Sequence, residues 1–457
     1  MDRETQRRLG AWYTPPELVD FVLDRVLSPR VSGPVRVLDP SCGDGRFLIA
    51  AGKELGSRAV LRGVDIDVDA VSAAQAALPT ATIVEGDALT HDWGLANFDV
   101  VVGNPPFLGQ MARRTSRGGR SAHGGGPYAD TAALFLSLAL QLARPDGGFV
   151  ALVLPQSILA TRDAGPIRAA VAANAALVDL WVAGEPMFDA AVHTIVAVFR
   201  RGHRQGVIRR WFGPSFEQVE PIHEPGDLAA RSSWSFLVAD LAGVPHVSPT
   251  TSGTVGDLAI VTADFRDQYY GLVGSVSDDA EGPALITSGL IDVARSHWGT
   301  RPTKFAKQRY LAPRVDLAAL SPKLQTWAAS RLVPKVLMAT QTKVIEALAD
   351  PEGQLLPSVP VISIVPHHPS DVWRVLAVLL APSTSAWAAT AYLGAGLSSS
   401  ALKLSAAQVR TLPLPSRPWD IAIAPLQAGD LPAFARAMNA AFEVPDEPVT
   451  RWWLDRV

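Results

Sequence analysis

The chain has 457 residues, of which 48% are hydrophobic and 19% are charged, so it can form about two to four domains with sizeable cores, and wholesale disorder is excluded. Its single cysteine, Cys42, excludes an intrachain disulfide and a cysteine-rich zinc site. No uninterrupted apolar run reaches the ~18–20 residues of a membrane span, and the N-terminus lacks a signal-peptide pattern, so we expect a cytoplasmic protein. The net charge of −3 does not by itself favour nucleic acid as a partner, so the placement of the charges matters more than their sum.

The first predicted element is an amphipathic helix that begins near Pro15. Thr14 is suited to be its N-cap, Pro15 suits the first helical position, and Glu17 can complete a capping box. On their own, these residues indicate only where a helix starts.

A buried strand is predicted at 35–38, followed by a glycine-rich turn and an alanine-rich helix. Gly43 and Gly45 in this turn can adopt positive φ and let a ligand approach the backbone closely. Strand, glycine-rich turn and helix together are typical of a Rossmann-like unit that binds a nucleotide-like ligand. The full G-x-G-x-x-G pattern and a following Lys-Ser/Thr pair are missing, which argues against a dinucleotide or a P-loop phosphate. The turn consists of Asp39, Pro40, Ser41, Cys42, Gly43, Asp44 and Gly45.

The next two predicted strands also end in acidic residues. Strand 59–64 runs into Asp65 and Asp67, about 20 residues after the glycines, where an acid can bind ribose hydroxyls. Strand 82–84 leads to Asp87. Any one of Asp39, Asp65 and Asp87 could simply cap the next helix. Because three successive strands end in this way, a ligand site at one edge of the sheet is the better interpretation.

A fourth predicted strand, 98–103, ends at Asn104-Pro105-Pro106-Phe107. Two prolines cannot continue a strand, so they form a rigid turn with fixed carbonyl directions. Asn104 adds a side-chain carbonyl at the end of the strand, where open α/β sheets bind ligands. The result is a small cup of hydrogen-bond acceptors beside an aromatic ring, which suits a planar amine such as the exocyclic NH2 of adenine.

With these motifs in this order, the chain resembles the S-adenosylmethionine-dependent DNA adenine-N6 methyltransferases of the γ-ordered, Taq type. In that family a catalytic domain precedes a target-recognition domain. The resemblance implies S-adenosylmethionine as the cofactor and a transfer that needs no metal. The catalytic motif that it implies is Asn104, Pro105, Pro106 and Phe107. The implied cofactor-binding residues are Tyr13, Thr14, Asp39, Pro40, Ser41, Cys42, Gly43, Gly45, Asp65, Ile66, Asp87, Ala88 and Leu89.

The same resemblance assigns individual roles. Asp65 would hold the cofactor ribose, Asp87 would contact its adenine, and Thr14 would lie at its methionine end. Phe188 would stack on the extruded target base, and a core phenylalanine is the alternative interpretation. His193 is either a proton acceptor near the site or an ordinary packed histidine.

Two groups of arginines could contact DNA. The first lies in a Gly- and Ser-rich stretch, 109–127, that is either a solvated loop or a flap that binds phosphates. The second, between Arg200 and Arg210, has the spacing of a hairpin whose turn is Arg200–Gly206, and a structural role is as consistent with it as DNA contact. The arginines of the first group are Arg113, Arg114, Arg117 and Arg120.

The predicted fold class is α/β: a Rossmann-like, seven-stranded class I methyltransferase domain followed by a mixed α+β target-recognition domain. The first domain would span residues 1–245, with its sheet ending near Trp211, and the second would span 246–457 after a linker at 245–253. In the second half, 256–261 and 285–291 are strand-like. Arg301, Lys304 and Lys307, with aromatic residues between them, are predicted to contact DNA, although an ordinary amphipathic surface would show the same pattern.

These observations predict a site-specific methyltransferase that acts on adenine N6 of a flipped-out base in duplex DNA. Duplex DNA would be the partner, a monomer is expected, and a separate restriction endonuclease or other defence-system subunit is an open partner. Two alternatives remain. The same cup could accept an RNA adenine or a protein glutamine amide, or the chain could be a non-catalytic DNA-binding subunit.

Overall fold

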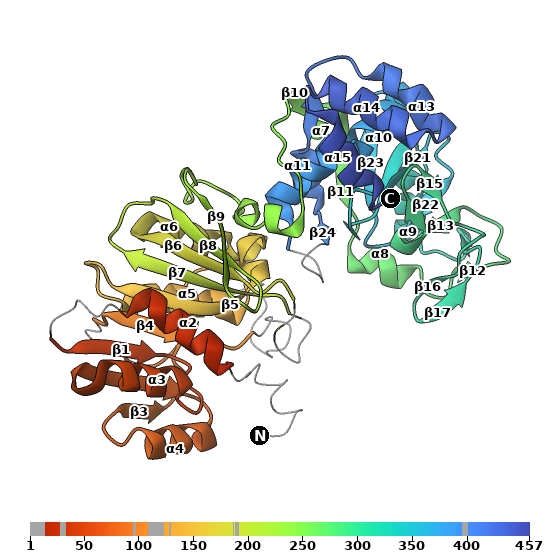
Figure 1. Ribbon diagram of the computed structural model, residues 1–457. Helices are drawn as coiled ribbons and strands as arrows, with labels where there is room; N and C mark the ends of the chain where they lie inside the picture. The colour runs from red at the N-terminus through yellow and green to blue at the C-terminus, as the bar shows by residue number, and fades with distance from the viewer. Residues whose placement is uncertain are drawn as a thin grey trace. The chain divides into compact units, whose positions relative to one another are not determined.

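In the computed structural model the chain forms two compact units, Met1–Leu241 and Ala242–Val457 (Figure 1). The boundary predicted from the sequence, after residue 245, lies a few residues further along the chain. Apart from the side chain of Arg266, the structure describes residues 14–27, 33–94, 97–107, 123–127, 129–185, 187, 192–394 and 401–457.

The first unit is built on one sheet, which has nine strands within the described residues, in the order β3-β2-β1-β4-β5-β7-β6-β8-β9. Alternating strands and helices give the Rossmann-like α/β architecture that the sequence predicted. The strands are β1 (Val35–Asp39), β2 (Ala59–Asp65), β3 (Thr82–Glu85), β4 (Val100–Gly103), β5 (Phe149–Pro155), β6 (Ala175–Val182), β7 (Thr194–Arg201), β8 (Ile208–Phe212) and β9 (Glu217–Ile222). The helices are α2 (Pro16–Val26), α3 (Arg46–Leu55), α4 (Val68–Ala77), α5 (Thr131–Leu142) and α6 (Gly165–Asn174).

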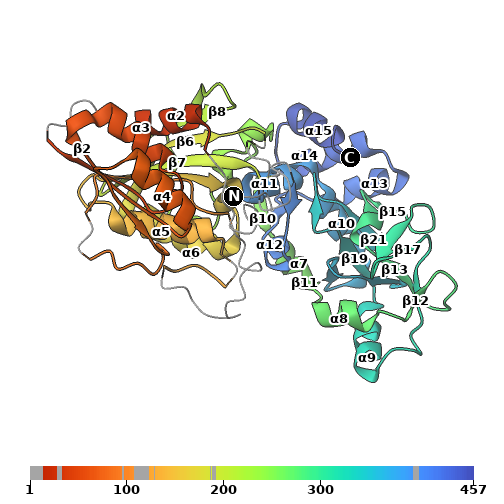
Figure 2. The same cartoon turned by 90° about the horizontal axis from the view of Figure 1, so that it is seen from below.

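Helices cover both faces of this sheet (Figure 2). α2, α3 and α4 pack on one face through Leu18, Phe47 and Val71, and α5 and α6 pack on the other through Leu136 and Ile167. Strands β1 to β5 run parallel to their neighbours within this group. Because the central strands are covered on both sides, their sequences are nearly continuous apolar runs rather than alternating ones.

The expected count of seven strands is wrong. β8 and β9 extend the sheet beyond β6 to Ile222, past the predicted end near Trp211. β8 pairs with β6 in parallel, so Arg200–Gly206 is not the turn of a hairpin but the start of a crossover from β7 to the far side of β6. β9 gave no strand signal because it is an edge strand in which three of the six residues are polar and exposed, and because it contains Pro221.

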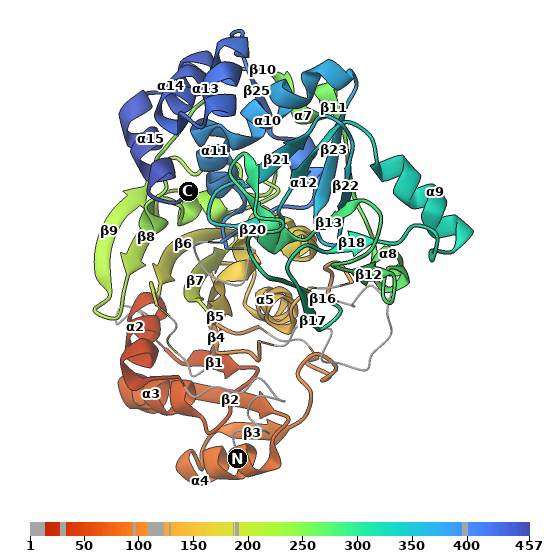
Figure 3. The same cartoon turned by 90° about the vertical axis from the view of Figure 1, so that its right-hand side faces the viewer.

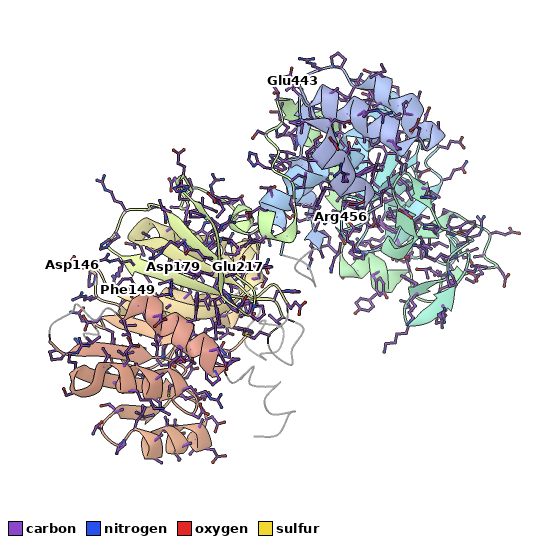
Figure 4. All side chains as sticks on the ribbon, viewed as in Figure 1. Asp146, Phe149, Asp179, Glu217, Glu443 and Arg456 are labelled. Carbon is purple, nitrogen blue, oxygen red and sulfur yellow. The ribbon has the colours of Figure 1, made fainter. Side chains whose placement is uncertain are left out.

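The arginines near β7 and β8 have structural partners. The buried guanidinium of Arg210 makes two hydrogen bonds to the Asp240 carboxylate, at 2.6 and 2.7 Å. Arg209 pairs with the buried Asp179 of β6 at 2.6 Å, and Figure 4 labels Asp179. These contacts favour the structural interpretation of this cluster over DNA contact. A further contact is that of the Arg200 guanidinium with the ring of Phe149, at 5.3 Å from the ring centroid.

The second unit is a mixed α+β fold, as the sequence predicted. One sheet has the order β11-β23-β19-β21 and another the order β12-β18-β13-β22, and short pairs of strands lie beside them. The strands of the two sheets are β11 (Ala259–Ala263), β23 (Ile362–Pro366), β19 (Lys335–Met338), β21 (Ala347–Asp350), β12 (Val276–Ser277), β18 (Arg314–Val315), β13 (Ala284–Ile286) and β22 (Leu355–Pro357). The pairs are β10 (Thr251–Thr254) with β25 (Pro413–Pro415), β14 (Ile291–Asp292) with β15 (Arg295–Ser296), β16 (Thr303–Phe305) with β17 (Gln308–Tyr310), and β20 (Gln341–Thr342) with β24 (Leu402–Lys403).

The helices of this unit gather mainly in its C-terminal part, where α13, α14 and α15 lie together and α10 lies against β21 (Figure 3). Within the described residues no single helix is long and apolar enough to cross a membrane, and one bent pair, Pro369–Leu380 with Pro382–Tyr392, meets the criterion by length and composition only. The helices are α7 (Val255–Leu258), α8 (Arg266–Gly271), α9 (Pro322–Arg331), α10 (Val372–Leu380), α11 (Pro382–Tyr392), α12 (Ala406–Arg410), α13 (Ile423–Ala428), α14 (Leu431–Ala441) and α15 (Asp446–Leu454).

Two strand predictions in the second unit are only partly right. Segment 256–261 begins as a helix, because the Asp257 carboxylate accepts the backbone N–H of Thr254 at 2.8 Å and closes a capping box before β11 begins. Segment 285–291 is interrupted by a 3-10 turn at Ser288–Leu290. The end of the predicted linker belongs to the second unit as well, because β10 pairs with β25 there.

Replacing Arg210 tests whether this cluster is structural. Arg210→Ala leaves the Asp240 carboxylate and a buried backbone carbonyl without their donor, so we expect a loss of about 3 kcal/mol in the free energy of unfolding. Arg204→Ala is the control, since Arg204 is exposed and makes no ion pair with any residue that the structure describes, and it should cost less than about 0.5 kcal/mol. Urea unfolding measures both, and equal effects would contradict the structural role.

Candidate active site at the carboxyl edge of the sheet

Four strands of the first unit end in or beside polar residues. β1 ends at Asp39 and β2 at Asp65, Asp87 follows the end of β3, and Asn104 directly follows β4. These strands are neighbours in the order β3-β2-β1-β4 and are parallel, so their carboxyl ends meet at one edge of the sheet. In open α/β sheets this edge is where ligands bind.

The glycine-rich turn folds back over the end of β2. Gly43 has a φ of +51° and its N–H donates to the Asp65 carboxylate at 2.7 Å, while Gly45 has a φ of +87° and precedes α3. A side chain on Gly43 would meet no described atom within 4 Å, so the turn borders open space in which a ligand can lie against the backbone. On the other side Gly63 makes room for the buried Cys42, whose thiol pKa burial raises, so Cys42 is a packing residue and not a reactive thiol.

Asp39 lies buried at the centre of this edge, with only 1% of its surface exposed. Its Oδ1 accepts the backbone N–H of Ser41 at 3.0 Å, and a Cβ added to Gly103, the residue before Asn104, would lie 2.7 Å from the same oxygen. Burial raises the pKa of the Asp39 carboxyl to about 8; the hydrogen bond from Ser41 opposes the rise, and the charge of Asp65 adds to it. Asp39 is therefore mostly protonated at neutral pH.

The Ser41 hydroxyl, in the same turn, is a buried oxygen with no hydrogen-bond partner within the described part of the chain. Buried polar groups nearly always have a partner, and one without it requires an explanation. A ligand with polar groups at this edge of the sheet would supply the missing partner. The turn therefore fits a cofactor by its open space, by its positive-φ glycines and by this oxygen.

Asp65 and Asp67 have different roles. Asp67 is the N-cap of α4, where its carboxylate accepts two backbone N–H groups, so the residue that caps this helix is Asp67 and not Asp65. Asp65 instead joins the turn to β2 through Gly43, and its pKa is raised chiefly by burial. Ile66 lies between them with 59% of its surface exposed, beside the predicted ribose position.

The segment after β3 forms a tight turn. Asp87 accepts the backbone N–H of Leu89 at 3.0 Å, and Ala88 is buried with its carbonyl bonded to the indole N–H of Trp93 at 2.9 Å. A ring nitrogen of His123 lies 2.8 Å from the Leu89 carbonyl oxygen, which ties the chain after the predicted arginine-rich loop to this turn. Asp87 thus lies on a well-fixed backbone at the end of its strand.

Asn104 is positioned by Thr14, a contact that the sequence did not reveal. The Asn104 Nδ2 donates to the Thr14 hydroxyl oxygen at 3.2 Å, and Thr14 is 96% buried. The predicted capping role of Thr14 is wrong, because α2 begins at Pro16 and Pro15 is its N-cap residue, without a side-chain cap. Since Nδ2 faces Thr14, the Asn104 Oδ1 is directed away from it.

Arg46 belongs to this group too, and sequence reasoning did not single it out. Its guanidinium donates to the Thr14 carbonyl oxygen at 3.2 Å and pairs with Asp44 at 3.1 Å. It therefore links the start of α2 to the glycine-rich turn. The sequence offers one indication of this role: Arg46 lies in the first turn of a helix, where the helix dipole favours acidic residues, so a basic residue there suggests a specific contact.

The rest of the Asn-Pro-Pro-Phe motif forms the edge of the site. Pro105 is buried, and Pro106 and Phe107 are half-buried. Phe107 packs against the core clusters of both faces of the sheet, so its ring lies over the end of the sheet rather than inside one helical layer. Phe107 is thus placed at the edge of the site with part of its surface exposed.

His193 precedes β7 on the chain, and β7 begins opposite the end of β5. The carbonyl oxygen of His193 accepts the Gln156 N–H at 2.8 Å, and burial lowers the pKa of the His193 ring, so the ring is mostly neutral at neutral pH.

Arg301, Lys304 and Lys307 lie in the second unit, in or next to the hairpin of β16 and β17. Other predicted site residues lie outside the described residues: Tyr13, Arg113, Arg114, Arg117, Arg120 and Phe188.

Residues 2–212 match the family model described as N-6 DNA Methylase. The Type II methyltransferase M.TthHB8I of Thermus thermophilus is 30% identical over 207 residues, which is 43% of this chain and 46% of that protein. The Type II methyltransferase M.BanIII of Aneurinibacillus aneurinilyticus is 24% identical over 303 residues, which is 58% of this chain and 51% of that protein. The chain therefore spans about half the length of these relatives.

Solved structures also match, at low identity. The methyltransferase subunit of a type I restriction-modification system from Streptococcus thermophilus is 19% identical and aligns over 47% of this chain and 50% of its own, with a TM-score of 0.38. The type IIG restriction endonuclease BpuSI is 15% identical and aligns over 100% of this chain and 66% of its own, with a TM-score of 0.43.

The buried Asp39 carboxyl predicts a pH-dependent stability difference. Its pKa is about 8 in the folded chain and about 4 in the unfolded chain, so between these values the folded state holds the extra proton and wild-type stability falls as pH rises. Asp39→Asn has no proton to lose. We expect its stability relative to wild type to rise between pH 5 and 8 by at most about 1.4 kcal/mol per pH unit, and to level off above pH 8. Urea unfolding at pH 5, 6.5 and 8 measures this difference, and a constant difference would contradict the buried, protonated state.

Proposed function

We propose that this chain is a site-specific DNA methyltransferase that transfers a methyl group from S-adenosylmethionine to N6 of an adenine flipped out of duplex DNA. The observation on which this rests most is the Asn104 carboxamide, oriented by Thr14, at the strand edge that also holds the glycine-rich turn and the buried Asp39. The match of residues 2–212 to the N-6 DNA Methylase family supports the same reaction.

The cofactor would bind along the ends of β1, β2 and β3. The positive-φ turn at Gly43 would lie beneath it, Asp65 would accept its ribose hydroxyls, and Asp87 would contact its adenine. The Ser41 hydroxyl would be a buried polar partner for the cofactor, and Thr14 would lie toward the methionine end of the cofactor. When bound, S-adenosylmethionine supplies an electrophilic methyl group on a sulfonium.

The target adenine would lie in the cup formed after β4. Its N6 lone pair is delocalised into the ring, so the amine is a poor nucleophile. The Asn104 Oδ1 and the Pro105 carbonyl oxygen can accept its two N–H groups, which favours a pyramidal nitrogen and stabilises the positive charge that develops on it. Phe107 would stack on the flipped base, with Phe188 proposed on its other face, and so offset part of the cost of unstacking.

Thr14 and Asp39 would act through position rather than by contact with the target. Thr14 holds Nδ2, so the carboxamide cannot turn its NH2 toward the adenine amine, where two donors would face each other. The Asp39 carboxyl fills the space beside Gly103 and fixes the backbone that leads into Asn104. Both contacts reduce the reorganisation needed when the base enters.

The order of motifs supports finer proposals. The cofactor turn precedes the Asn-Pro-Pro-Phe motif, and both precede the second unit, so we place the chain in the γ order with residues 246–457 as a target-recognition domain. Two relatives are Type II methyltransferases, which supports a role in restriction-modification beside a separate endonuclease. Since one base is modified in each event, a monomer suffices.

A methyl-transfer assay with wild type and Asn104→Ala tests the reaction. We expect labelled methyl groups from S-adenosylmethionine to appear as N6-methyladenine in one short motif of unmethylated genomic DNA. Asn104→Ala should lose about 10²–10³-fold in kcat and still bind the cofactor, because only the oriented acceptor is removed. Label in RNA or protein but not in DNA would mean that the chain acts on one of the alternative substrates. Full activity of Asn104→Ala would overturn the catalytic assignment.

Replacing Thr14 tests the positioning role. Thr14→Val keeps the shape and removes the hydroxyl that holds Asn104 Nδ2, so we expect kcat to fall about tenfold, with KM for DNA little changed. Thr14→Ser retains the hydroxyl and should stay within about threefold of wild type. If the serine variant were as impaired as the valine variant, packing of the methyl group, and not the hydrogen bond, would explain the effect.

A further inference from the structure

Positive charge is concentrated in one segment of the second unit. Residues 242–457 contain 18 basic and 18 acidic residues, yet six basic residues and no acidic residue lie between Asp292 and Asp316. The centre of this segment is the hairpin of β16 and β17, which projects at the lower edge of the second unit in Figure 1. The acid-free segment of the sequence therefore includes a hairpin that projects from the unit.

The inner face of the hairpin, which carries Thr303 and Phe305, packs against the rest of the second unit. Phe305 is buried in a core cluster and its ring lies 4.8 Å from that of Tyr269. The Tyr269 hydroxyl accepts the backbone N–H of Ala306 at 3.0 Å, and the hydroxyls of Thr303 and Thr287 are 2.6 Å apart and buried. The hairpin is thus a rigid platform, and its charge is presented on a fixed backbone.

The outer face of the same hairpin brings like charges together. Lys304 and Arg309 are directly opposite each other in the register, both exposed, and Lys307 lies in the turn between them. Like charges in directly opposite positions destabilise a strand pair. The acids of the neighbouring turn, Asp278 among them, make no ion pair with these three residues in the described structure, and Asp278 instead accepts the backbone N–H groups of Leu311 and Ala312.

The turn itself is strained. Ala306 and Lys307 have φ values of +48° and +68°. A two-residue hairpin turn of this kind requires positive φ at both positions and is normally built from Asn and Gly. Lys307 adopts positive φ at a cost in free energy that glycine would not have, and it places a cation at the tip of the hairpin. Strained backbone of this kind is found most often at functional sites.

Other basic residues nearby do have internal partners. The Arg314 guanidinium lies 4.7 Å from the centroid of the Trp298 ring and donates to the Gly282 carbonyl oxygen at 2.7 Å. Arg301 donates to the Gly289 carbonyl oxygen at 3.4 Å. Structural roles therefore explain part of the basic segment but not the three residues of the hairpin's outer face.

We propose that the β16–β17 hairpin is a clamp for the DNA backbone, in which Lys304, Lys307 and Arg309 bind phosphates of the target duplex and thereby hold the second unit on its substrate. This rests on the proposed function, since it specifies how the DNA is held. Phosphates bound by Lys304 and Arg309 would relieve the repulsion between them, because the negative charge of a DNA backbone is what such a group of cations neutralises. Backbone contacts of this kind fix register and orientation and do not read sequence.

The test uses the full chain and a 30-base-pair duplex that contains the methylation motif. The double variant Lys304→Gln/Arg309→Gln should bind the duplex at least tenfold more weakly at 0.15 M salt, and the slope of log K against log salt should become shallower by about 1.8. KM for DNA should rise, while kcat at saturating DNA stays within twofold. The matched control, Lys323→Gln/Arg436→Gln, removes two exposed cations elsewhere in the same unit and should change none of these values.

A single substitution at the tip separates binding from folding. Lys307→Gly removes the cation and relieves the strained φ, so we expect the melting temperature to rise by about 2 °C while the salt slope becomes shallower by about 0.9. A merely structural role would link stability and binding, and both would then change in the same direction.

The outcomes distinguish this clamp from the reaction itself. If wild type methylates DNA and the hairpin variants keep its affinity, salt slope and KM, the clamp is wrong and the function stands. If wild type binds the duplex but transfers no methyl group to it, the proposed reaction is wrong. The salt slopes of the hairpin variants would still test the clamp. A wild-type chain that binds no duplex would overturn both.

Discussion

The site depends on one constraint of the sheet: the parallel strands β3, β2, β1 and β4 must end at the same edge. This brings together residues that are up to 65 positions apart, from Asp39 to Asn104. Because β1 and β4 are adjacent, the Asp39 carboxyl is buried beside the last residue of β4, and only glycine fits at position 103. The protonated state of Asp39 follows from this burial, since an ionised carboxylate there would be poorly solvated.

The contact between Thr14 and Asn104 connects this edge to the start of α2. It orients the carboxamide without any group of the substrate, so the acceptor geometry is set before the substrate arrives. The hairpin of the second unit follows the same principle at larger scale, because Phe305 and Tyr269 fix its backbone and the charges of Lys304 and Arg309 are presented before DNA binds. In both places contacts within the protein fix a polar or charged group before the ligand binds.

The sequence predicts the parts of the fold that are buried and continuous. The strands that end at Asp39, Asp65 and Gly103 are apolar runs followed by turn residues, and such runs are easily read. β9 was missed because half of its residues are polar and exposed and it contains a proline. The roles of Thr14 and Arg46 were missed because they depend on contacts between residues 90 and 32 positions apart. In the second unit most strands have only two to five residues, too few for an alternating pattern to be visible.

The most direct test of the account is a calorimetric titration of the full chain with S-adenosylmethionine, for wild type and Asp87→Asn. The account predicts one cofactor per chain, bound at the carboxyl edge. Asp87→Asn should weaken binding at least about tenfold, because the amide keeps the turn to Leu89 but loses the charge that strengthens a hydrogen bond to the cofactor. A folded wild-type chain that does not bind the cofactor, or a variant that binds as tightly as wild type, would contradict the location of the site.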